Sequence, residues 1–356
     1  MRDPGLAAWL TLCLCPRLAP SRIRRLLKAF GLPQQVLAAD AAALALVAGA
    51  EVASALKSPP LAAAVEQALR WASVAGHHVI TLADANYPAP LLEIGDPPPL
   101  LYAHGDAGLL GRPGLAMVGS RNATAQGMRN AEAFARSFSN AGLTIVSGLA
   151  LGIDAAAHRG GLAGAGATIA VLGTGVDVVY PAGNAALHAD IAARGLLLSE
   201  FPLGTPALAG NFPRRNRLIS GLARGCVVVE AALASGSMIT ARQAGEQGRE
   251  VFAIPGSIHS PLSKGCHALI KQGAKLVETA EDVLAELGGW RLPAAPEPAP
   301  AQAEGLLAHL GFDPVDIDAL CARSGLPAEQ VSAQLLHLEL EGQIAALPGG
   351  RYQRLI

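Results

Sequence analysis

From residue 78 onward the chain alternates short apolar runs with longer stretches of helical periodicity. The runs are rich in Val, Ile and Leu and are shorter than typical helices, which predicts strands. Strands that are apolar throughout are buried on both faces, and this requires a parallel sheet with helices on either side. The alternation therefore predicts a doubly wound, Rossmann-like α/β domain over residues 76–290. The expected strands are residues 79–82, 100–103, 116–119, 144–147, 168–172, 196–199, 227–230 and 251–254, and the expected helices between the later strands are 126–141, 153–162, 185–193 and 238–247.

The regions on either side of this domain have different sequence patterns. Residues 1–75 show helical periodicity broken by prolines and glycines, which predicts an all-helical, SAM-like domain. Residues 291–301 are rich in Pro and Ala, as in a semi-rigid linker. Residues 302–356 predict a winged helix, two helices followed by a hairpin. Because residues 302–342 hold seven acidic residues and one basic residue, Arg323, we expect this domain to contact protein rather than DNA.

Composition excludes several classes of protein. The apolar run at residues 7–15 is much shorter than the roughly 20 residues that span a bilayer, and it lacks the basic start and cleavage site of a secretory signal. We therefore expect a cytoplasmic protein with no membrane partner. The five cysteines contain no Cys-x-x-Cys pair and the nine histidines show no metal-ligand spacing, so neither a metal nor another cofactor is expected.

One segment is basic although the formal net charge of the chain is -1. Residues 201–229 contain no Asp or Glu, and they include four arginines at positions 214, 215, 217 and 224. We expect a short helix beginning at Pro213, on which Arg215 shares the apolar side with Leu218 and Ile219. An arginine on that side either extends along the apolar surface to reach water or faces a ligand crevice at the rim of the sheet, where Phe212 would be a stacking platform beside it. The alternative is a surface helix with a solvated basic face.

The strand-to-helix loops are the other candidates for a binding site, because ligands of parallel sheets lie beyond the carboxyl ends of the strands. Four of these loops are rich in Gly, Ser or Thr, namely residues 118–124, 147–154, 173–177 and 230–240. Glycine allows close backbone approach, and helix N-termini favour anions. These loops indicate an anionic ligand. The dinucleotide fingerprint is incomplete because its third glycine is missing, and there is no P-loop.

No catalytic set assembles from the sequence. Asp154 and His158 are spaced i, i+4 on an expected helix, which is more often a structural pair than an acid/base couple. Glu230 ends an expected strand and could act as a base, cap a helix or pair with an arginine. We therefore predict that the chain binds its ligand without turnover.

Taken together, these motifs resemble the bacterial DNA-processing protein A family, also called DprA or Smf. The resemblance covers residues 87–284 in the expected order. It rests on Gly119-Ser120-Arg121, on Ser147-Gly148-Leu149-Ala150-Leu151-Gly152-Ile153-Asp154, on Phe212-Pro213-Arg214-Arg215-Asn216-Arg217-Leu218-Ile219-Ser220-Gly221, on Ser235-Gly236-Ser237 and on Lys264-Gly265.

The resemblance implies an extended Rossmann fold that forms a homodimer and binds single-stranded DNA without strong sequence preference. It also implies that the protein loads the RecA recombinase onto this DNA during natural transformation, where a single-strand-binding protein is a possible further partner. Carried over by position, phosphates would be held by Arg121, Arg215, Arg217 and Lys264, bases would be met by Phe212 and Asn216, and further donors would come from Gly119, Ser120, Ser235, Gly236 and Ser237. Arg214 would be the replaceable outward neighbour in the same DNA-binding segment.

Two other functions are compatible with parts of the sequence. The sheet also resembles that of phosphoribohydrolases, which process nucleotides, but the glutamate of their motif is replaced at Ala241 or nearby. A winged-helix transcription factor would need a basic recognition helix, which the acidic C-terminal domain lacks. The basic residues at positions 22–28 are interpreted as a solvated face rather than a second nucleic-acid contact.

Overall fold

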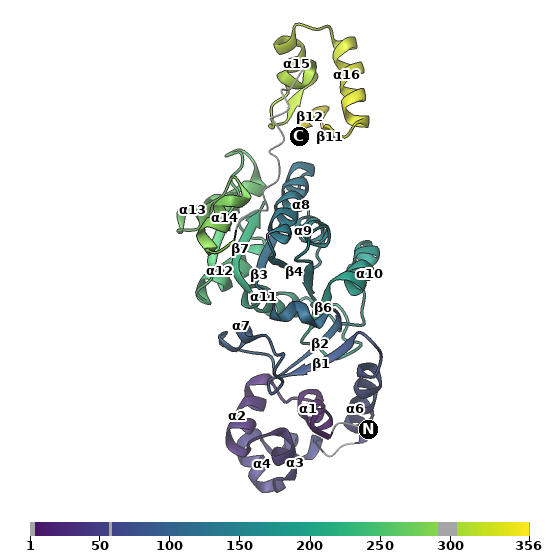
Figure 1. Cartoon of the computed structure of the whole chain (residues 1–356), viewed down its shortest axis with the longest axis vertical. Coiled ribbons are helices and arrows are strands. Elements are labelled where there is room, and N and C mark those ends of the chain that lie inside the picture. Colours follow the sequence, from purple (N-terminus) through teal and green to yellow (C-terminus); the bar gives the residue numbers. More distant parts are fainter. Residues whose placement is uncertain (1–3, 57–58, 291–304, 356) are drawn as a thin grey trace.

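A computed structural model describes residues 4–56, 59–290 and 305–355. The molecule is elongated, with helices of the N-terminal region at one end, a large sheet in the middle and a small helical and hairpin unit at the other end (Figure 1). The expected linker at residues 291–301 lies outside the described residues.

Within the described residues nine strands form one sheet in the order β1-β2-β6-β5-β4-β3-β7-β8-β9. The strands are β1 (His77–Thr81), β2 (Leu100–Gly105), β3 (Gly114–Gly119), β4 (Thr144–Ser147), β5 (Thr168–Val171), β6 (Leu196–Ser199), β7 (Ala223–Val229), β8 (Glu250–Ala253) and β9 (Lys275–Leu276). Strands β3 to β9 pair in parallel, which confirms the predicted fold class. The pairs β1–β2 and β2–β6 are antiparallel, so one edge of the sheet departs from the all-parallel expectation.

Helices cover both faces of the parallel strands, as their apolar sequences require. The helices that follow β1 are α7 (Ala89–Leu92), α8 (Ala125–Asn140), α9 (Ile153–Leu162), α10 (Ala185–Arg194), α11 (Asn211–Gly221), α12 (Gly236–Glu246), α13 (Lys264–Lys271) and α14 (Ala280–Leu287). Side chains alternate between the faces of each strand. Ala116 and Val118 pack with α11 and α12, whereas Leu115 and Met117 pack with α8 and α9. The helix predicted to begin at Pro213 begins two residues earlier, because a proline is tolerated anywhere in the first turn, where backbone N–H groups lack helical partners.

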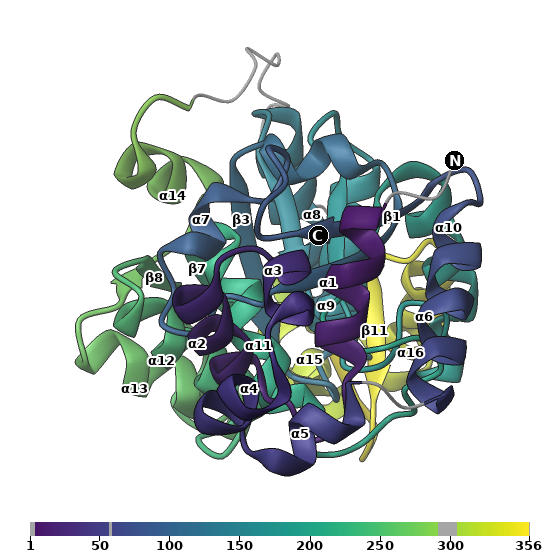
Figure 2. The same ribbon diagram turned by 90° about the horizontal axis from the view of Figure 1, so that it is seen from below.

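The N-terminal helices share a hydrophobic core with the sheet rather than having one of their own. They are α1 (Pro4–Leu14), α2 (Pro20–Phe30), α3 (Pro33–Ala38), α4 (Ala41–Ala48), α5 (Ala50–Ala55) and α6 (Pro59–Ala72). Trp9 and Leu12 belong to the same buried cluster as Tyr102 and Leu197. Figure 2, seen from this end, shows α1 to α4 lying across the sheet. The expected N-terminal helical domain therefore shares one hydrophobic core with the sheet.

The C-terminal unit has the predicted winged-helix pattern. Its elements are β10 (Val315–Asp316), α15 (Ile317–Ser324), α16 (Ala328–Leu340), β11 (Ile344–Leu347) and β12 (Arg351–Arg354), and the three strands pair in the order β10-β12-β11. A small core of its own includes Leu320 and Leu335. Arg129 of α8 donates to the backbone oxygen of Gly342 at 2.5 Å, which places the unit against the sheet domain.

The described residues contain no membrane-spanning helix, no metal-ligand cluster and no disulfide. None of the helices at residues 4–56, 59–290 and 305–355 is long and apolar enough to cross a membrane. The same residues contain no cluster of three or more His, Cys, Asp or Glu side chains that could hold a metal ion. The five cysteines, all within these ranges, are free thiols.

Candidate functional site

The candidate site lies where the direction of the chain across the sheet reverses. Strand β3 is flanked by β4 on one side and β7 on the other, so the loops that follow β3 and β7 diverge and leave a crevice at the carboxyl edge. A cavity of about 680 Å³ occupies this position. It is lined by nine of the predicted site residues, namely Gly119, Ser120, Arg121, Phe212, Arg215, Asn216, Ser235, Gly236 and Ser237.

The first wall is the turn that ends β3. A Cβ atom at Gly119 would lie 1.9 Å from the backbone oxygen of Val229, so only glycine allows the ends of β3 and β7 to come this close. The backbone N–H of Ser120 donates to the oxygen of Glu230 at 2.8 Å, which fixes the turn. Arg121 is exposed, and its Cζ atom lies 6.0 Å from the centroid of the Phe212 ring. The turn thus presents a solvated cation at the cavity mouth.

Two aromatic rings stand beside this cation. The ring of Tyr180 lies 5.5 Å from that of Phe212, with 40° between their planes. Gly173, after β5, leaves room for the Phe212 ring, because a Cβ atom there would lie 2.6 Å from Cδ1 of Phe212. Rings beside a guanidinium provide a surface on which a planar ligand can stack while a charged group is held.

The opposite wall is the start of α12. Ser235 caps this helix by accepting from the backbone N–H of Ser237 at 3.3 Å, and the two hydroxyl oxygens lie 2.7 Å apart. Asn216 donates to the backbone oxygen of Gly236 at 3.4 Å, which ties α11 to this turn. The first N–H groups of a helix lack helical partners and favour anions. This wall therefore offers hydroxyl and backbone donors.

Arg215 lies at the bottom of the cavity and is 4% exposed, on the inward side of α11 that its helical position predicted. Its Nη1 donates to the backbone oxygens of Gly148, at 2.9 Å, and of Val171, and its Nε donates to Asn216 at 3.2 Å. Burial lowers the pKa of Arg215 to about 10, which leaves it cationic at neutral pH. Much of its donor capacity thus holds the ends of β4 and β5, and its role as a phosphate ligand stays a prediction.

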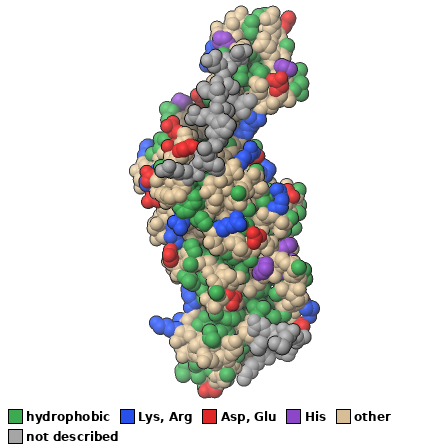
Figure 3. Space-filling model, in the orientation of Figure 1, with side chains coloured by type: hydrophobic (Ala, Val, Ile, Leu, Met, Phe, Trp, Pro, Cys, Tyr) green, Lys and Arg blue, Asp and Glu red, His purple; other side chains and the backbone are tan. Residues whose placement is uncertain are grey.

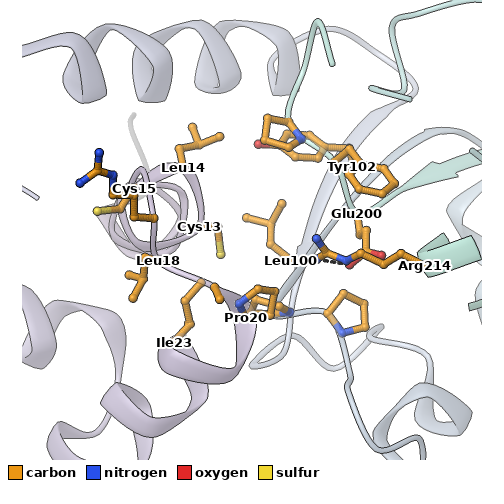
Figure 4. Close-up of a pocket in the computed structure, with 16 residues that line it drawn as sticks. Cys13, Leu14, Cys15, Leu18, Pro20, Ile23, Leu100, Tyr102, Glu200 and Arg214 are labelled. Atoms are coloured by element: carbon orange, nitrogen blue, oxygen red, sulfur yellow. Dashed lines mark hydrogen bonds and ion pairs between the residues drawn. The ribbon is translucent and has the colours of Figure 1, made fainter. Parts of the chain in front are cut away.

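Arg217 lies outside the cavity, contrary to the expectation that it meets the ligand there. Its Nη2 pairs with Glu200 at 2.8 Å and with Asp96 at 3.4 Å, and its side chain is 11% exposed. Arg214 pairs with the same Glu200 at 3.0 Å, and both Arg214 and Glu200 line a second cavity (Figure 4). The segment without carboxylates in sequence therefore has two carboxylates beside it in space, and the predicted phosphate contact of Arg217 is not favoured by this geometry.

Lys264 also lies outside the lining of the cavity. It is exposed at the start of α13, two residues after Leu262, which does line the cavity. Its predicted phosphate contact therefore requires a ligand that extends beyond the cavity edge.

On the face that Figure 3 shows, Lys and Arg side chains are scattered rather than gathered into one broad patch.

The three candidate acid/base groups, Asp154, Glu230 and His158, accept hydrogen bonds from backbone N–H groups of the strand-to-helix loops. Asp154 accepts from the backbone N–H groups of Gly148 at 3.1 Å and Ala150 at 3.4 Å. Burial raises the pKa of Asp154, and nearby Arg215 and the two amide donors oppose that rise. Glu230 accepts from the backbone and the hydroxyl of Thr124, the residue that caps α8, so of its three possible roles the structure favours the cap.

His158 is a buried structural base in the same loop network. Its Nε2 accepts from the backbone N–H of Leu149 at 3.2 Å, and its Nδ1 lies 2.7 Å from the hydroxyl of Thr168. Burial, with smaller contributions from Arg215 and Arg159, lowers the pKa of His158 to about 3. The neutral imidazole therefore holds the loop that follows β4.

This burial predicts a loss of stability in mild acid. Because the folded pKa of His158 lies below the ordinary value of 6.5, the unfolded chain binds one more proton between those values. The free energy of unfolding should thus fall as pH drops below 6.5, by up to about 1.4 kcal/mol per pH unit from this group. Urea unfolding of the wild type and of His158→Gln between about pH 7 and pH 5 measures the effect. Equal pH dependence in the two proteins would show that His158 does not contribute.

Comparisons with known proteins identify the family of the chain. The family described as DNA recombination-mediator protein A matches residues 78–288, more than half of the chain, and the DprA winged helix domain matches residues 291–350. Protein Smf of Escherichia coli K12 is 47% identical over 303 residues, which cover 82% of this chain and 81% of that protein. The chain belongs to the DNA recombination-mediator protein A family.

Solved structures of the family are similar to this fold. DprA from Streptococcus pneumoniae has a TM-score of 0.67 at 39% identity, covering 80% of this chain and 99% of that chain. A second structure, described as giving "structural insights into the unique single-stranded DNA binding mode" of DNA processing protein A from Helicobacter pylori, has a TM-score of 0.54 at 31% identity and covers 59% of this chain and 95% of that chain.

Three residues were given no role in the site from the sequence, although Asn122 belongs to the predicted loop 118–124. Tyr180 and Asn122 line the cavity, and Glu200 holds the outer side of α11. Aromatic residues make up only 4% of the chain, so an aromatic residue in a loop between expected strands was a usable sequence signal for Tyr180. The role of Glu200 had no such signal, because it depends on contacts with Arg214 and Arg217.

Proposed function

We propose that this chain binds single-stranded DNA in the cavity beyond the carboxyl ends of β3 and β7, without strong sequence preference and without catalysis. The observation that carries the proposal is the exposed Arg121 guanidinium over the Phe212 ring, with Tyr180 beside it, at the mouth of a cavity lined by Ser235 and Ser237. A guanidinium can hold a phosphate while rings stack on bases of any identity. Duplex DNA offers no unstacked bases to these rings.

The geometry gives less support to a phosphoribohydrolase. Asp154 accepts hydrogen bonds from the backbone of its own loop, Glu230 accepts from Thr124 in the loop after β3, and Ala241 stands in or near the position of that group's glutamate. Neither carboxylate is therefore positioned as an uncommitted general base. Incubation with nucleoside monophosphates tests this alternative, since released free base would support an enzyme.

The biological role that we propose is loading of RecA onto single-stranded DNA in recombination and natural transformation, by a cytoplasmic homodimer. The family description as a DNA recombination mediator supports this role. A single-strand-binding protein is proposed as a further partner, and the acidic winged helix as a protein contact. Gel filtration with light scattering tests the dimer, and RecA strand-exchange assays on DNA covered by single-strand-binding protein test loading.

A gel shift of single-stranded and double-stranded oligonucleotides at two salt concentrations tests the binding proposal most directly. We expect a clear preference for single strands and weaker binding at high salt, because phosphate contacts release counterions. Equal affinity for both forms would contradict recognition by stacking. Binding that does not change with salt would contradict phosphate contacts.

Moving the Phe212 ring should weaken this binding. Gly173→Ala places a methyl group 2.6 Å from the present position of Cδ1 of Phe212, so the ring must shift. We expect about a tenfold loss of affinity for single strands, within the roughly 1–3 kcal/mol that one base stack contributes. Gly245→Ala on α12 is the matched control, because no heavy atom outside its local backbone lies within 4 Å of that Cβ position. Equal affinities for the two variants would contradict stacking on Phe212.

A further inference from the structure

A second cavity, of about 340 Å³, lies on another side of α11, between the N-terminal helices and the sheet. One wall comes from the end of α1 and the start of α2, and the other comes from β2, residues 200–202 and Arg214. Figure 4 shows Cys13, Leu14 and Ile23 on one side of this space and Tyr102, Glu200 and Arg214 on the other. The cavity exists because the N-terminal helices pack onto the sheet, and the function proposed above does not use it.

Two buried polar atoms of the sheet-side wall lack a partner in the described part of the chain. Glu200 is 2% exposed in its side chain, and its Oε2 accepts from Arg214 and Arg217 whereas its Oε1 is unpaired. Tyr102 is 1% exposed, and its hydroxyl is also unpaired. Buried polar atoms in folded proteins are nearly always hydrogen-bonded. Both residues line this cavity, so a molecule bound there that carries both hydrogen-bond donors and acceptors would satisfy the carboxylate oxygen and the hydroxyl.

The charges around this wall favour an anion at its Arg214 side. The ion-pair cluster joins three cations, Arg24, Arg214 and Arg217, to two anions, Asp96 and Glu200, which leaves one positive charge in excess. The Arg214 side chain is 44% exposed, with its Cζ 5.5 Å from the centroid of the Phe201 ring. A guanidinium has five N–H donors, so one that pairs with Glu200 through Nη2 retains donors for a phosphate.

The remaining lining suits a flat ring. It consists largely of apolar and proline side chains, among them Leu18, Pro20, Pro99, Leu100 and Pro202. A nucleobase presents apolar faces and an edge that carries both N–H donors and acceptors, which is the combination that Glu200 Oε1 and the Tyr102 hydroxyl require. The volume lies within the range of roughly 300–1,000 Å³ that small-molecule sites occupy.

We propose that this second cavity binds a nucleotide, with its phosphate at Arg214 and its base facing Glu200 and Tyr102. The nucleotide is either a free nucleoside monophosphate or one unit of a bound strand. The chemistry of recognition is the same for both sources. Binding of a free nucleotide does not depend on the DNA-binding function proposed above.

Titration calorimetry of the full chain with deoxyadenosine monophosphate tests the site. Ala19 is exposed, lines the cavity and has an extended backbone, so Ala19→Trp fills the space without disturbing the core. We expect Arg214→Gln to weaken binding by about tenfold or more, the effect of losing one charge-assisted contact. We expect Ala19→Trp to weaken binding at least as much, because the indole occupies the cavity. Ala29→Trp, at an exposed position of the same helix outside the cavity, is the matched control and should bind as the wild type does. Inorganic phosphate and deoxyadenosine should each bind more weakly than the monophosphate.

Short and long oligothymidylates distinguish the two sources. If the site holds one unit of a strand, Ala19→Trp weakens binding of long oligonucleotides more than of short ones. A wild type that binds the monophosphate, sensitive to Ala19→Trp, but binds no single strands would support this site and contradict the proposed DNA-binding function. The inference is overturned if Ala19→Trp changes neither monophosphate nor oligonucleotide binding relative to Ala29→Trp.

Discussion

Arg121→Ala is expected to reduce affinity for single-stranded DNA by about 10- to 100-fold, the value of one or two hydrogen bonds to a charged group. Arg121 is exposed at the cavity mouth, over the Phe212 ring, and no acidic residue pairs with it in the described part of the chain. It is therefore the cation of this site that is most available to a phosphate. Its loss should weaken binding to all sequences equally, because phosphates carry no sequence information.

Salt dependence separates this contact from an indirect effect. Losing one phosphate contact should reduce the slope of log affinity against log salt by about 0.7. Arg121→Lys should keep the slope of the wild type but bind more weakly. Lysine keeps the positive charge but lacks the planar guanidinium that can donate two hydrogen bonds to one phosphate. Arg136→Ala on the outer part of α8 is the matched control, since it removes the same charge from an exposed i, i+4 pair with Glu132. Fluorescence anisotropy at several salt concentrations measures all four proteins, and an unchanged slope in Arg121→Ala would remove this residue from the phosphate ligands.

Arg215→Ala is expected to destabilise the fold by about 3–5 kcal/mol, the cost of breaking a buried charged network by removing one partner. The substitution removes the donors to the backbone oxygens of Gly148 and Val171. It also leaves Asp154, which is 7% exposed, without the cation that affects its charge most strongly. Glycine at position 148 leaves room for this guanidinium, because a Cβ atom there would lie 2.6 Å from Nη2 of Arg215.

Urea unfolding followed by circular dichroism measures this loss. Arg214→Ala is the control, because its side chain is 44% exposed and Glu200 keeps its pair with Arg217 when Arg214 is removed. Arg215→Ala and Arg214→Ala with equal unfolding midpoints would show that the buried guanidinium does not hold the loops together. A fall in DNA affinity without a fall in stability would instead support Arg215 as a direct phosphate ligand.

Much of the fold could be predicted from local pattern. The apolar runs at residues 144–147 and 196–199 became β4 and β6 with the predicted bounds, because a strand buried on both faces leaves a continuous apolar signature. The antiparallel edge was missed. The pairing of β2 with β1 and β6 depends on the path of residues 82–99 and on packing against α1, neither of which leaves a periodic pattern.

The sequence predicted those parts of the candidate site that depend on strand ends and on helical periodicity. Gly119, Phe212 and Ser235 line one cavity because each follows or packs upon the carboxyl end of a parallel strand. The helical position of Arg215 also predicted its inward direction, since a helix fixes which side chains share a face. These features follow from periodicity, and periodicity is a property of the sequence.

The roles of the individual arginines were decided only by the tertiary structure. Arg217 pairs with Asp96, 121 positions away in the chain, and Arg215 donates to Val171, 44 positions away. The interaction of a charge depends on its distance in space from other charges and on its exposure to water. The sequence by itself determined which residues reach the sheet edge. Packing then determined which of them keep an exposed charge for a ligand, because it alone sets those distances and the local exposure.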